Sequence, residues 1–209
     1  MAKKKHHRRS EFPLSREQVR AIINAEIPSK RQRNPAILQR DRVLLKVLAH
    51  LALRASEAAE LDWADLDLAT GSATIDGKGD KVRVLRFGKR YPDLLADLRI
   101  MKGSKRRGPV FASLRPGKVQ HITRQRIGQL VGAYADAAGI KSPNPGVKRV
   151  HPHMLRHSWA QNANADGLSI QYIRYWLGHD SSQTTIEQYL GVSQDSMEEA
   201  LMQTLGDDV

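Results

Sequence analysis

Apolar residues recur at helical spacing along most of the chain, and this pattern predicts a mainly helical fold. The strongest example is a deeply buried helix predicted from Pro35 to about Leu53, where apolar side chains return on successive turns. Ser15 followed by Gln18 is a capping-box pattern and predicts a helix start, with Val19 on the buried face. Further helices are predicted over residues 56–61 with Ser56 as the cap, around 94–98, and over 123–138, 153–166, 170–177 and 194–205.

One stretch has the alternation and turn chemistry of a β-hairpin. Ser72–Asp76 and Val82–Phe87 are rich in β-forming residues, and Gly77-Lys78-Gly79-Asp80 lies between them. The chain contains no internal repeat and no linker that would divide it. We therefore predict an α+β protein, mainly α with a small antiparallel β-sheet, in which residues 13–209 form one domain after a basic tail at residues 1–12.

Composition adds a large positive charge to this picture. The 209 residues include 34 Lys and Arg against 22 Asp and Glu, which gives a net charge of +12. Such an excess in a chain with 40% hydrophobic residues favours a polyanionic partner, a nucleic acid, over a merely soluble basic protein. Candidate DNA-binding residues lie in the tail and in two later basic stretches: Lys3, Lys4, Lys5, Arg8, Arg9, Lys81, Lys105, Arg106 and Arg107. The alternative is that these stretches are only solvated surface and a flexible end.

Several classes of protein are excluded by composition. The chain has no Cys, so disulfides and thiolate zinc sites are excluded. No apolar run approaches the roughly 18 residues that a membrane span needs. The basic start, Met1 to Arg9, has no hydrophobic stretch behind it and is not a secretory signal. These features predict a cytoplasmic protein, associated with the nucleoid when bound to DNA.

Six polar residues far apart in the chain have the chemistry needed to bind and cut a phosphodiester. They are Arg54, Lys78, His153, Arg156, His179 and Tyr189. Two guanidinium groups can hold phosphate oxygens bidentately, and a phenol can act as a nucleophile without a metal or other cofactor. His153 and Arg156 are spaced to lie on one face of a helix.

The order and context of these residues resemble the catalytic domain of tyrosine recombinases, the phage-integrase and Xer-like family. The similarity extends from about Pro13 to Val192. The segments that carry it are Leu53-Arg54-Ala55-Ser56-Glu57, Gly77-Lys78-Gly79-Asp80-Lys81, His153-Met154-Leu155-Arg156-His157, Leu177-Gly178-His179 and Tyr189. Any one of these segments is weak evidence, whereas the ordered set is specific.

The resemblance implies a site-specific recombinase or integrase that joins DNA to Tyr189 through a 3′-phosphotyrosyl bond. Arg54 and Arg156 would hold the non-bridging oxygens and stabilise the charge of the transition state. Lys78 would protonate the leaving 5′ oxygen. Because the phosphotyrosyl bond conserves the energy of the phosphodiester, rejoining needs no ATP.

The histidines and Glu57 have secondary roles in this scheme. His153 would be the general base or would orient Tyr189, and His179 would donate a hydrogen bond to the phosphate. Glu57 would orient His153 or an arginine, and His157 would support Arg156 or the backbone.

Simpler interpretations remain for several of these residues. Arg54 could form only a helix-end ion pair with Glu57, and Lys81 could exchange roles with Lys78. The stretch between His179 and Tyr189 is about one residue longer than is usual in the family, which on a helix would turn the phenol by about 100°. Such a shift would weaken the site unless the extra residue lies in a loop.

Two other assignments are disfavoured. His151, His153 and His157 have a metal-like spacing, but the neighbouring arginines would repel a cation, so no metal is expected. Tyr172 and Tyr175 occupy core positions of the family and are poor replacements for Tyr189. Trp63, Trp159 and Trp176 are expected to pack in the core.

The family resemblance also implies an assembly. A tetramer on paired DNA sites is expected, with an apolar stripe of the last helix (Met197, Leu201 and Leu205) docked either on its own chain or on a neighbour. Family members commonly carry an N-terminal helical domain that clamps the duplex; here the basic tail or an accessory DNA-binding partner is expected to replace it. The rival functions are a non-catalytic recombinase-like DNA-binding regulator and a relaxing activity of the type IB topoisomerase kind.

Overall fold

The computed structural model describes residues 13–27, 34–77, 82–105, 107–113, 119–178 and 194–204, with only the backbone described for residues 194–198. The mainly helical prediction is confirmed within these ranges. The helices are α1 (Arg16–Asn24), α2 (Pro35–His50), α3 (Ala55–Glu60), α4 (Pro92–Lys102), α5 (Arg124–Ala137), α6 (Pro152–Ala165), α7 (Ile170–Leu177), α9 (Gln194–Thr204) and the short 3₁₀ helix η2 (Trp63–Asp65). None of the described helices combines the length and the apolar character that crossing a membrane requires.

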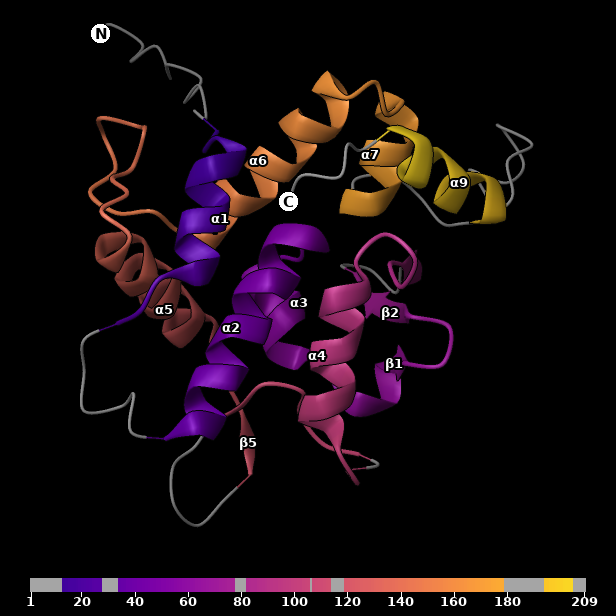
Figure 1. Cartoon of the computed structure of the whole chain (residues 1–209), viewed down its shortest axis with the longest axis horizontal. Coiled ribbons are helices and arrows are strands. Elements are labelled where there is room, and N and C mark those ends of the chain that lie inside the picture. Colours follow the sequence, from indigo (N-terminus) through magenta and orange to yellow (C-terminus); the bar gives the residue numbers. More distant parts are fainter. Residues whose placement is uncertain are drawn as a thin grey trace, which may run out of the picture.

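Helix α2 lies at the centre of the molecule and packs against α1, α3, α4 and α6 (Figure 1). Its Leu44, Val47 and Leu48 are fully buried, as the helical periodicity predicted. The helix ends at His50, slightly before the predicted boundary, and Ala52 then takes a left-handed conformation with φ of 51°. This conformation is uncommon for a residue with a Cβ, and the carbonyl of Ala52 accepts a hydrogen bond from Arg156.

The two helix starts predicted from capping patterns have different outcomes. At α1 the capping box is confirmed, because Ser15 Oγ accepts from Gln18 N and the Gln18 side chain accepts from Ser15 N. At α3 the prediction of Ser56 as the cap was wrong, since the helix begins at Ala55 with Arg54 in the N-cap position. The Glu57 carboxylate reaches back to accept the backbone N–H of Arg54 at 2.7 Å, so the acceptor at this helix start is the third residue of the helix.

The predicted hairpin is present. Strands β2 (Ser72–Asp76) and β3 (Val82–Arg86) pair antiparallel with Thr74 opposite Val84, and β1 (Leu66–Asp67) adds to the other edge of β2. Gly71 permits this arrangement, since a Cβ there would lie 2.3 Å from the Cα of Gly88. A second small sheet, β4 (Ala112–Ser113) with β5 (Gln120–His121), was not predicted. Two-residue strands carry too little alternation to be recognised in a sequence.

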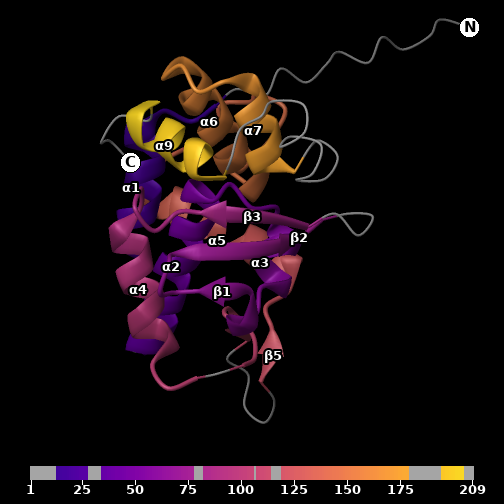
Figure 2. The ribbon, with the colours of Figure 1, turned by 90° about the vertical axis from the view of Figure 1, so that its right-hand side faces the viewer.

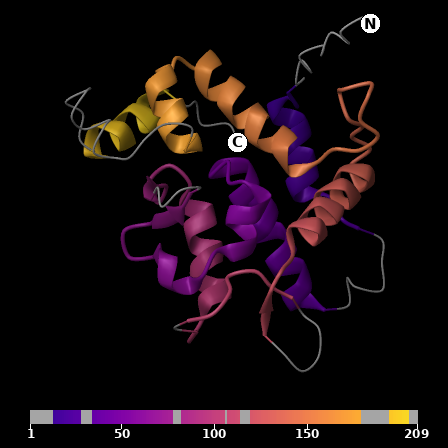
Figure 3. The same cartoon turned by 180° about the vertical axis from the view of Figure 1, so that it is seen from behind.

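The C-terminal helices lie on one side of this framework. Figure 2 shows α6, α7 and α9 above the three-stranded sheet, with β3 nearest to them, and α7 contacts β3. Figure 3 shows α1 and α5 side by side next to α6, and these three helices contact one another. Trp159 of α6 stacks on Trp176 of α7 with ring centroids 5.4 Å apart, and both are buried, as is Trp63. The fold therefore brings α3, β3, α6 and the end of α7 together.

Candidate active site

The residues proposed from the sequence are partly within the described structure. Those described are Arg54, Glu57, His153, Arg156 and His157, together with Lys105 and Arg107 of the basic stretches. Those outside the described residues are Lys3, Lys4, Lys5, Arg8, Arg9, Lys78, Lys81, Arg106, His179 and Tyr189. The described part of the site therefore comprises its arginines, the Glu57 carboxylate and the helix end that precedes His179.

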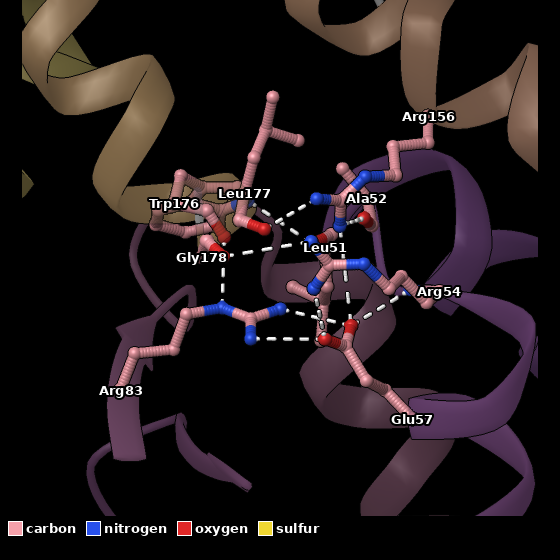
Figure 4. A network of polar contacts seen from close by, with 9 residues as sticks. All are labelled: Leu51, Ala52, Arg54, Glu57, Arg83, Arg156, Trp176, Leu177 and Gly178. Atoms are coloured by element: carbon pink, nitrogen blue, oxygen red, sulfur yellow. Dashed lines mark hydrogen bonds and ion pairs between the residues drawn. The ribbon is translucent and has the colours of Figure 1, made fainter. Parts of the chain in front are cut away.

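Glu57 lies at the centre of the site and binds two arginines (Figure 4). Arg54 Nη1 donates to Glu57 Oε1 at 2.7 Å, and Arg54 N donates to Oε2 at 2.7 Å. Arg83 approaches with both terminal nitrogens, Nη1 to Oε1 at 3.1 Å and Nη2 to Oε2 at 2.9 Å. Arg156 Nη1 lies 3.9 Å from Oε2. A single carboxylate on α3 thus gathers guanidinium groups from α3, β3 and α6.

The same guanidinium groups hold the C-terminal end of α7. Arg83 Nε donates to the Trp176 carbonyl at 2.9 Å, Arg156 Nη2 donates to the Leu177 carbonyl, and Arg54 Nη2 lies 3.5 Å from the Gly178 carbonyl. The last carbonyls of a helix have no partner within the helix and carry its negative dipole end, so cations are favourable there. The three arginines therefore fix the backbone that leads directly to His179.

The turn after α2 completes the framework. Arg156 Nη1 donates to the Ala52 carbonyl at 2.7 Å, and Trp176 Nε1 donates to the Leu51 carbonyl at 3.1 Å. The left-handed conformation of Ala52 thus serves a contact with a residue of the site. This is the kind of local strain that surrounding structure must maintain.

Positive charge exceeds negative charge in this cluster. Three guanidinium groups face one carboxylate, and the side chains of Glu57, Arg83 and Arg156 are only 5%, 5% and 2% exposed. Burial alone would raise the pKa of Glu57, but the hydrogen bonds from Arg83 and Arg54 outweigh it and hold that pKa below 4.5. Burial, with the charge of Arg54, lowers the pKa of Arg156 to about 9. Glu57 and Arg156 are therefore both charged near pH 7. The excess of guanidinium groups over carboxylates in the cluster favours an anion.

Arg54 is the arginine of this cluster that solvent can reach. Its side chain is 38% exposed, while its guanidinium is anchored at one end by Glu57. Arg156 is buried and hydrogen-bonded to the carbonyls of Ala52 and Leu177. An incoming phosphate would consequently meet Arg54 first. It would contact Arg156 only after the Leu177 carbonyl had moved away from that guanidinium group.

The histidines of the second motif form their own pair near the start of α6. His153 is exposed, and its Nε2 lies 2.9 Å from Nε2 of His157, with the ring centroids 4.3 Å apart. A hydrogen bond between two ring nitrogens needs one donor and one acceptor, so one imidazole is neutral when the bond exists. His151 stacks further away, with its ring centroid 6.5 Å from that of His153. Within the described part of the chain no group of three or more His, Asp or Glu side chains is arranged so that it could hold a metal ion.

Arg83 is the site residue that the sequence reasoning missed. The hairpin register places Arg83 opposite Ile75, on the same face of β3 as Leu85, and all three are buried. A charged residue at an inward-facing strand position is unusual, because it must find a buried partner. The alternation of the strand, with an arginine at an inward position, is the signal that could have identified it.

The basic residues at the end of α4 are on the surface. Lys105 and Arg107 are exposed, and Lys105 Nζ donates to the Met101 carbonyl at 3.2 Å. Lys105, three residues beyond the end of α4, therefore binds a carbonyl of the last turn of that helix. Its contact with DNA stays a prediction.

Comparison with known proteins gives a consistent result. The phage integrase family matches residues 13–195. Tyrosine recombinase XerD of Mycobacterium leprae (strain TN) is 32% identical over 188 residues, which cover 85% of this chain and 56% of the relative. Tyrosine recombinase XerC of Xanthomonas axonopodis pv. citri (strain 306) is 35% identical over 147 residues, covering 70% of this chain and 45% of the relative. The chain thus spans about half the length of the curated relatives it matches.

Solved structures agree at the level of the fold. A crystal structure of XerA recombinase has a TM-score of 0.64 and 25% identity, covering 92% of this chain and 64% of that protein. The lambda integrase catalytic core has a TM-score of 0.60 and 15% identity, covering 80% of this chain and 95% of that core. A lambda integrase dimer bound to a COC′ core site also matches, with a TM-score of 0.59, 16% identity, and coverage of 83% of this chain and 59% of that protein. The predicted fold class is confirmed by these matches.

Proposed function

The chain belongs to the phage integrase family, and from this premise we propose that it is a site-specific recombinase that cuts and rejoins double-stranded DNA. The observation that carries the proposal is the buried arginine cluster, in which three guanidinium groups share the Glu57 carboxylate and one of them, Arg54, is accessible. Excess fixed positive charge around a single accessible guanidinium suits a phosphodiester. Relatives named tyrosine recombinases and a DNA-bound integrase of the same fold support it.

The first step of the proposed reaction is the capture of the scissile phosphate. Arg54 contacts a non-bridging oxygen, and Arg156 adds positive charge from behind it and contacts the phosphate once the Leu177 carbonyl shifts. Arg54 is held by Glu57 before DNA arrives, so it needs little reorganisation, whereas Arg156 needs the shift of the Leu177 carbonyl as negative charge builds on the phosphorus. His179 follows directly on Gly178 and would donate a further hydrogen bond to the phosphate.

Tyr189 is the proposed nucleophile. Its phenolic oxygen attacks phosphorus, the bond from phosphorus to the 5′ oxygen breaks, and the DNA 3′ phosphate becomes linked to the tyrosine. His153 accepts or orients the phenolic proton, and Lys78 supplies a proton to the leaving 5′ oxygen. Rejoining reverses these transfers: a 5′ hydroxyl attacks the phosphotyrosyl bond and the phenol regains its proton, so no ATP or metal takes part.

The proposed partner is double-stranded DNA, bound by more than one copy of the chain. The net charge of +12 supplies the non-specific attraction to the duplex. The matching lambda integrase structure is a dimer on its DNA site, and recombination of two sites needs at least two copies at each. A tetramer on paired sites follows from this scheme.

Tyr189→Phe tests the proposed nucleophile. On a nicked suicide duplex that traps the cleaved strand, the wild-type protein should form a covalent protein–DNA adduct, and Tyr189→Phe should form none, because only the phenolic oxygen is lost. DNA affinity, measured by fluorescence anisotropy, should be unchanged. Gel analysis under denaturing conditions detects the adduct.

Tyr172→Phe is the matched control, since Tyr172 lies in the first turn of α7 and also carries a phenol. It should retain adduct formation. An adduct that persists in Tyr189→Phe would place the nucleophile elsewhere. DNA binding by the wild-type protein without any adduct would instead indicate a non-catalytic DNA-binding regulator.

A further inference from the structure

We propose that Arg83 is a positioning residue of this site, which holds Arg54 against the scissile phosphate by fixing Glu57 and the end of α7. The proposal rests on the recombinase function proposed above. Arg83 does not itself contact DNA in this scheme, because its side chain is 5% exposed. Its effect passes through the groups it binds.

Arg83 fixes the orientation of the Glu57 carboxylate. Its two terminal nitrogens donate to the two carboxylate oxygens at 3.1 and 2.9 Å. A bidentate pair defines the plane of the carboxylate as well as its position, which a single ion pair cannot do. Glu57 Oε1 also accepts from Arg54 Nη1 at 2.7 Å, so the orientation set by Arg83 determines where the Arg54 guanidinium lies.

Arg83 also fixes the end of α7, where Arg54 Nη2 lies 3.5 Å from the Gly178 carbonyl. Its Nε donates to the Trp176 carbonyl, at a sequence distance of 93 residues. A Cβ on Gly178 would lie 2.8 Å from Arg83 Nη1, so the guanidinium occupies the space directly beside that backbone. Arg83 therefore joins strand β3 to the end of α7, beside a second link in which the Tyr175 hydroxyl binds the backbone of Val84.

A gain in stability alone does not explain why a buried arginine occupies position 83. A buried ion pair is often replaceable by apolar residues of similar volume with little loss of stability, because desolvation of the charges offsets their attraction. Here the fold places an additional buried cation beside Arg54 and Arg156, which already exceed the single carboxylate in charge. What the planar guanidinium adds is simultaneous geometric control of Glu57 and Trp176.

Arg83→Lys keeps the charge but cannot make the three hydrogen bonds of the fork. In single-turnover cleavage of a nicked suicide duplex, the rate of adduct formation should fall by about 100-fold, the cost of a misplacement on the order of 1 Å. DNA affinity should stay within about twofold, because phosphate contacts over the whole duplex dominate binding. Arg86→Lys is the matched control, since Arg86 lies on the same strand but on its opposite face, and it should cleave like the wild type.

A double-mutant cycle separates positioning from a general effect on the fold. If Arg83 acts through Arg54, then Arg83→Lys should cost less than about threefold in an Arg54→Lys background, because the orientation it controls is already lost. A loss of about 100-fold in both backgrounds would overturn the proposal, as would wild-type cleavage by Arg83→Lys. Urea unfolding of each variant checks that it is folded under the conditions in which the cleavage rates are compared. Should the lysine variant not fold, Arg83→Met supplies the same cycle, since an apolar side chain of similar length tolerates burial.

The outcomes for the two proposals are distinct. Wild-type adduct formation that is abolished in Tyr189→Phe but unchanged in Arg83→Lys removes the role of Arg83 and leaves the recombinase function intact. Absence of an adduct with the wild-type protein overturns the recombinase function, and the positioning role falls with it.

Discussion

At the scale of single residues, Glu57 has the strongest influence on the site, because its two oxygens face more guanidinium groups than they can neutralise. Arg54 and Arg83 bind it directly and Arg156 lies 3.9 Å away. Loss of the carboxylate would leave these cations in mutual repulsion in a buried setting. The stability of the fold and the geometry of the site therefore depend on the same side chain.

Glu57→Gln is expected to lower the free energy of unfolding by about 3 kcal/mol, because it removes the negative charge but keeps the shape. Urea denaturation near pH 7 measures this loss. The matched control is Asp97→Asn, which breaks the Lys46–Asp97 pair at 2.6 Å between side chains that are 25% and 34% exposed. Because that pair is partly solvated, the control should cost less than about 1 kcal/mol. Equal losses in the two variants would contradict the central role of Glu57.

The buried side chain of His50 is expected to make the stability of the fold fall at acidic pH. It is buried and stacks on Tyr91 at 4.5 Å, and among the described residues its Nδ1 has no hydrogen-bond partner. Burial, with the charges of Lys46 and Arg90, lowers its pKa from 6.5 to about 4. The unfolded chain therefore takes up a proton at His50 before the folded protein does. The stability that the neutral His50 side chain contributes is therefore fully present above pH 6.5 and is lost as the pH falls from 6.5 to about 4.

Urea unfolding at about pH 7.5 and about pH 5 in the wild type and in His50→Phe tests this prediction. The wild type should lose about 2 kcal/mol more than the variant between the two pH values, because the phenyl ring stacks on Tyr91 without titrating. The same loss in both proteins would show that His50 is not the group responsible.

At the scale of elements, the end of α7 is where a helix, a strand and the site meet. Gly178 ends the helix in the left-handed conformation with φ of 63°, which a glycine adopts readily at this position after a helix. The arginines then bind the carbonyls of Trp176, Leu177 and Gly178. The helix terminus therefore has two requirements at once, a glycine conformation and space for the Arg83 guanidinium.

Gly178→Ala should be more destabilising than an alanine at an otherwise similar helix end. Gly139, which follows α5, has φ of 70°, and a Cβ added there would meet no atom within 4 Å, whereas a Cβ at Gly178 would lie 2.8 Å from Arg83 Nη1. Gly139→Ala should cost about 1 kcal/mol from the backbone conformation alone. Gly178→Ala should cost about 2 to 3 kcal/mol, since Arg83 is held by buried hydrogen bonds and cannot move freely. Thermal and urea unfolding measure the loss of stability in each variant. Equal losses would show that the Arg83 side chain moves aside at little cost.

At the scale of the whole molecule, the last helix packs on its own chain. Leu201 of α9 is 4% exposed and belongs to the main core, while Met202 is 44% exposed. Thr204 lies beside Gly167, the turn that follows α6. Docking in cis or in trans was open from the sequence; in the single chain Leu201 packs within that chain, and docking on a neighbour in an assembly stays a prediction.

Leu201→Ala is therefore expected to destabilise the isolated protein by about 2 to 3 kcal/mol, through lost burial and the cavity left behind. Met202→Ala, one residue further on the same helix, should cost less than about 0.5 kcal/mol. Unfolding measured at two protein concentrations should give the same midpoints, because the contact is within one chain. A cost that grows with dilution would indicate docking on a neighbouring copy.

Much of the fold could be predicted because its elements are encoded locally. Helical periodicity located α2, α5, α6 and α7, and alternation with glycine turns located the β2–β3 hairpin. The short strands β1, β4 and β5 were not predicted, since their pairing depends on partners rather than on their own residues. The cap of α3 was assigned wrongly for a related reason, because a carboxylate reaching back along the chain replaced the expected serine.

The sequence by itself determined which residue types were available, in which order, and on which helix or hairpin. It identified Arg54, Glu57 and Arg156 as candidates, and their catalytic roles stay a prediction. Only the tertiary structure decided that Glu57 joins these arginines and that Arg83 is among them. The reason is physical: the contacts of the site connect residues up to 125 positions apart, and they form only after the core has packed α3, β3, α6 and α7 against one another.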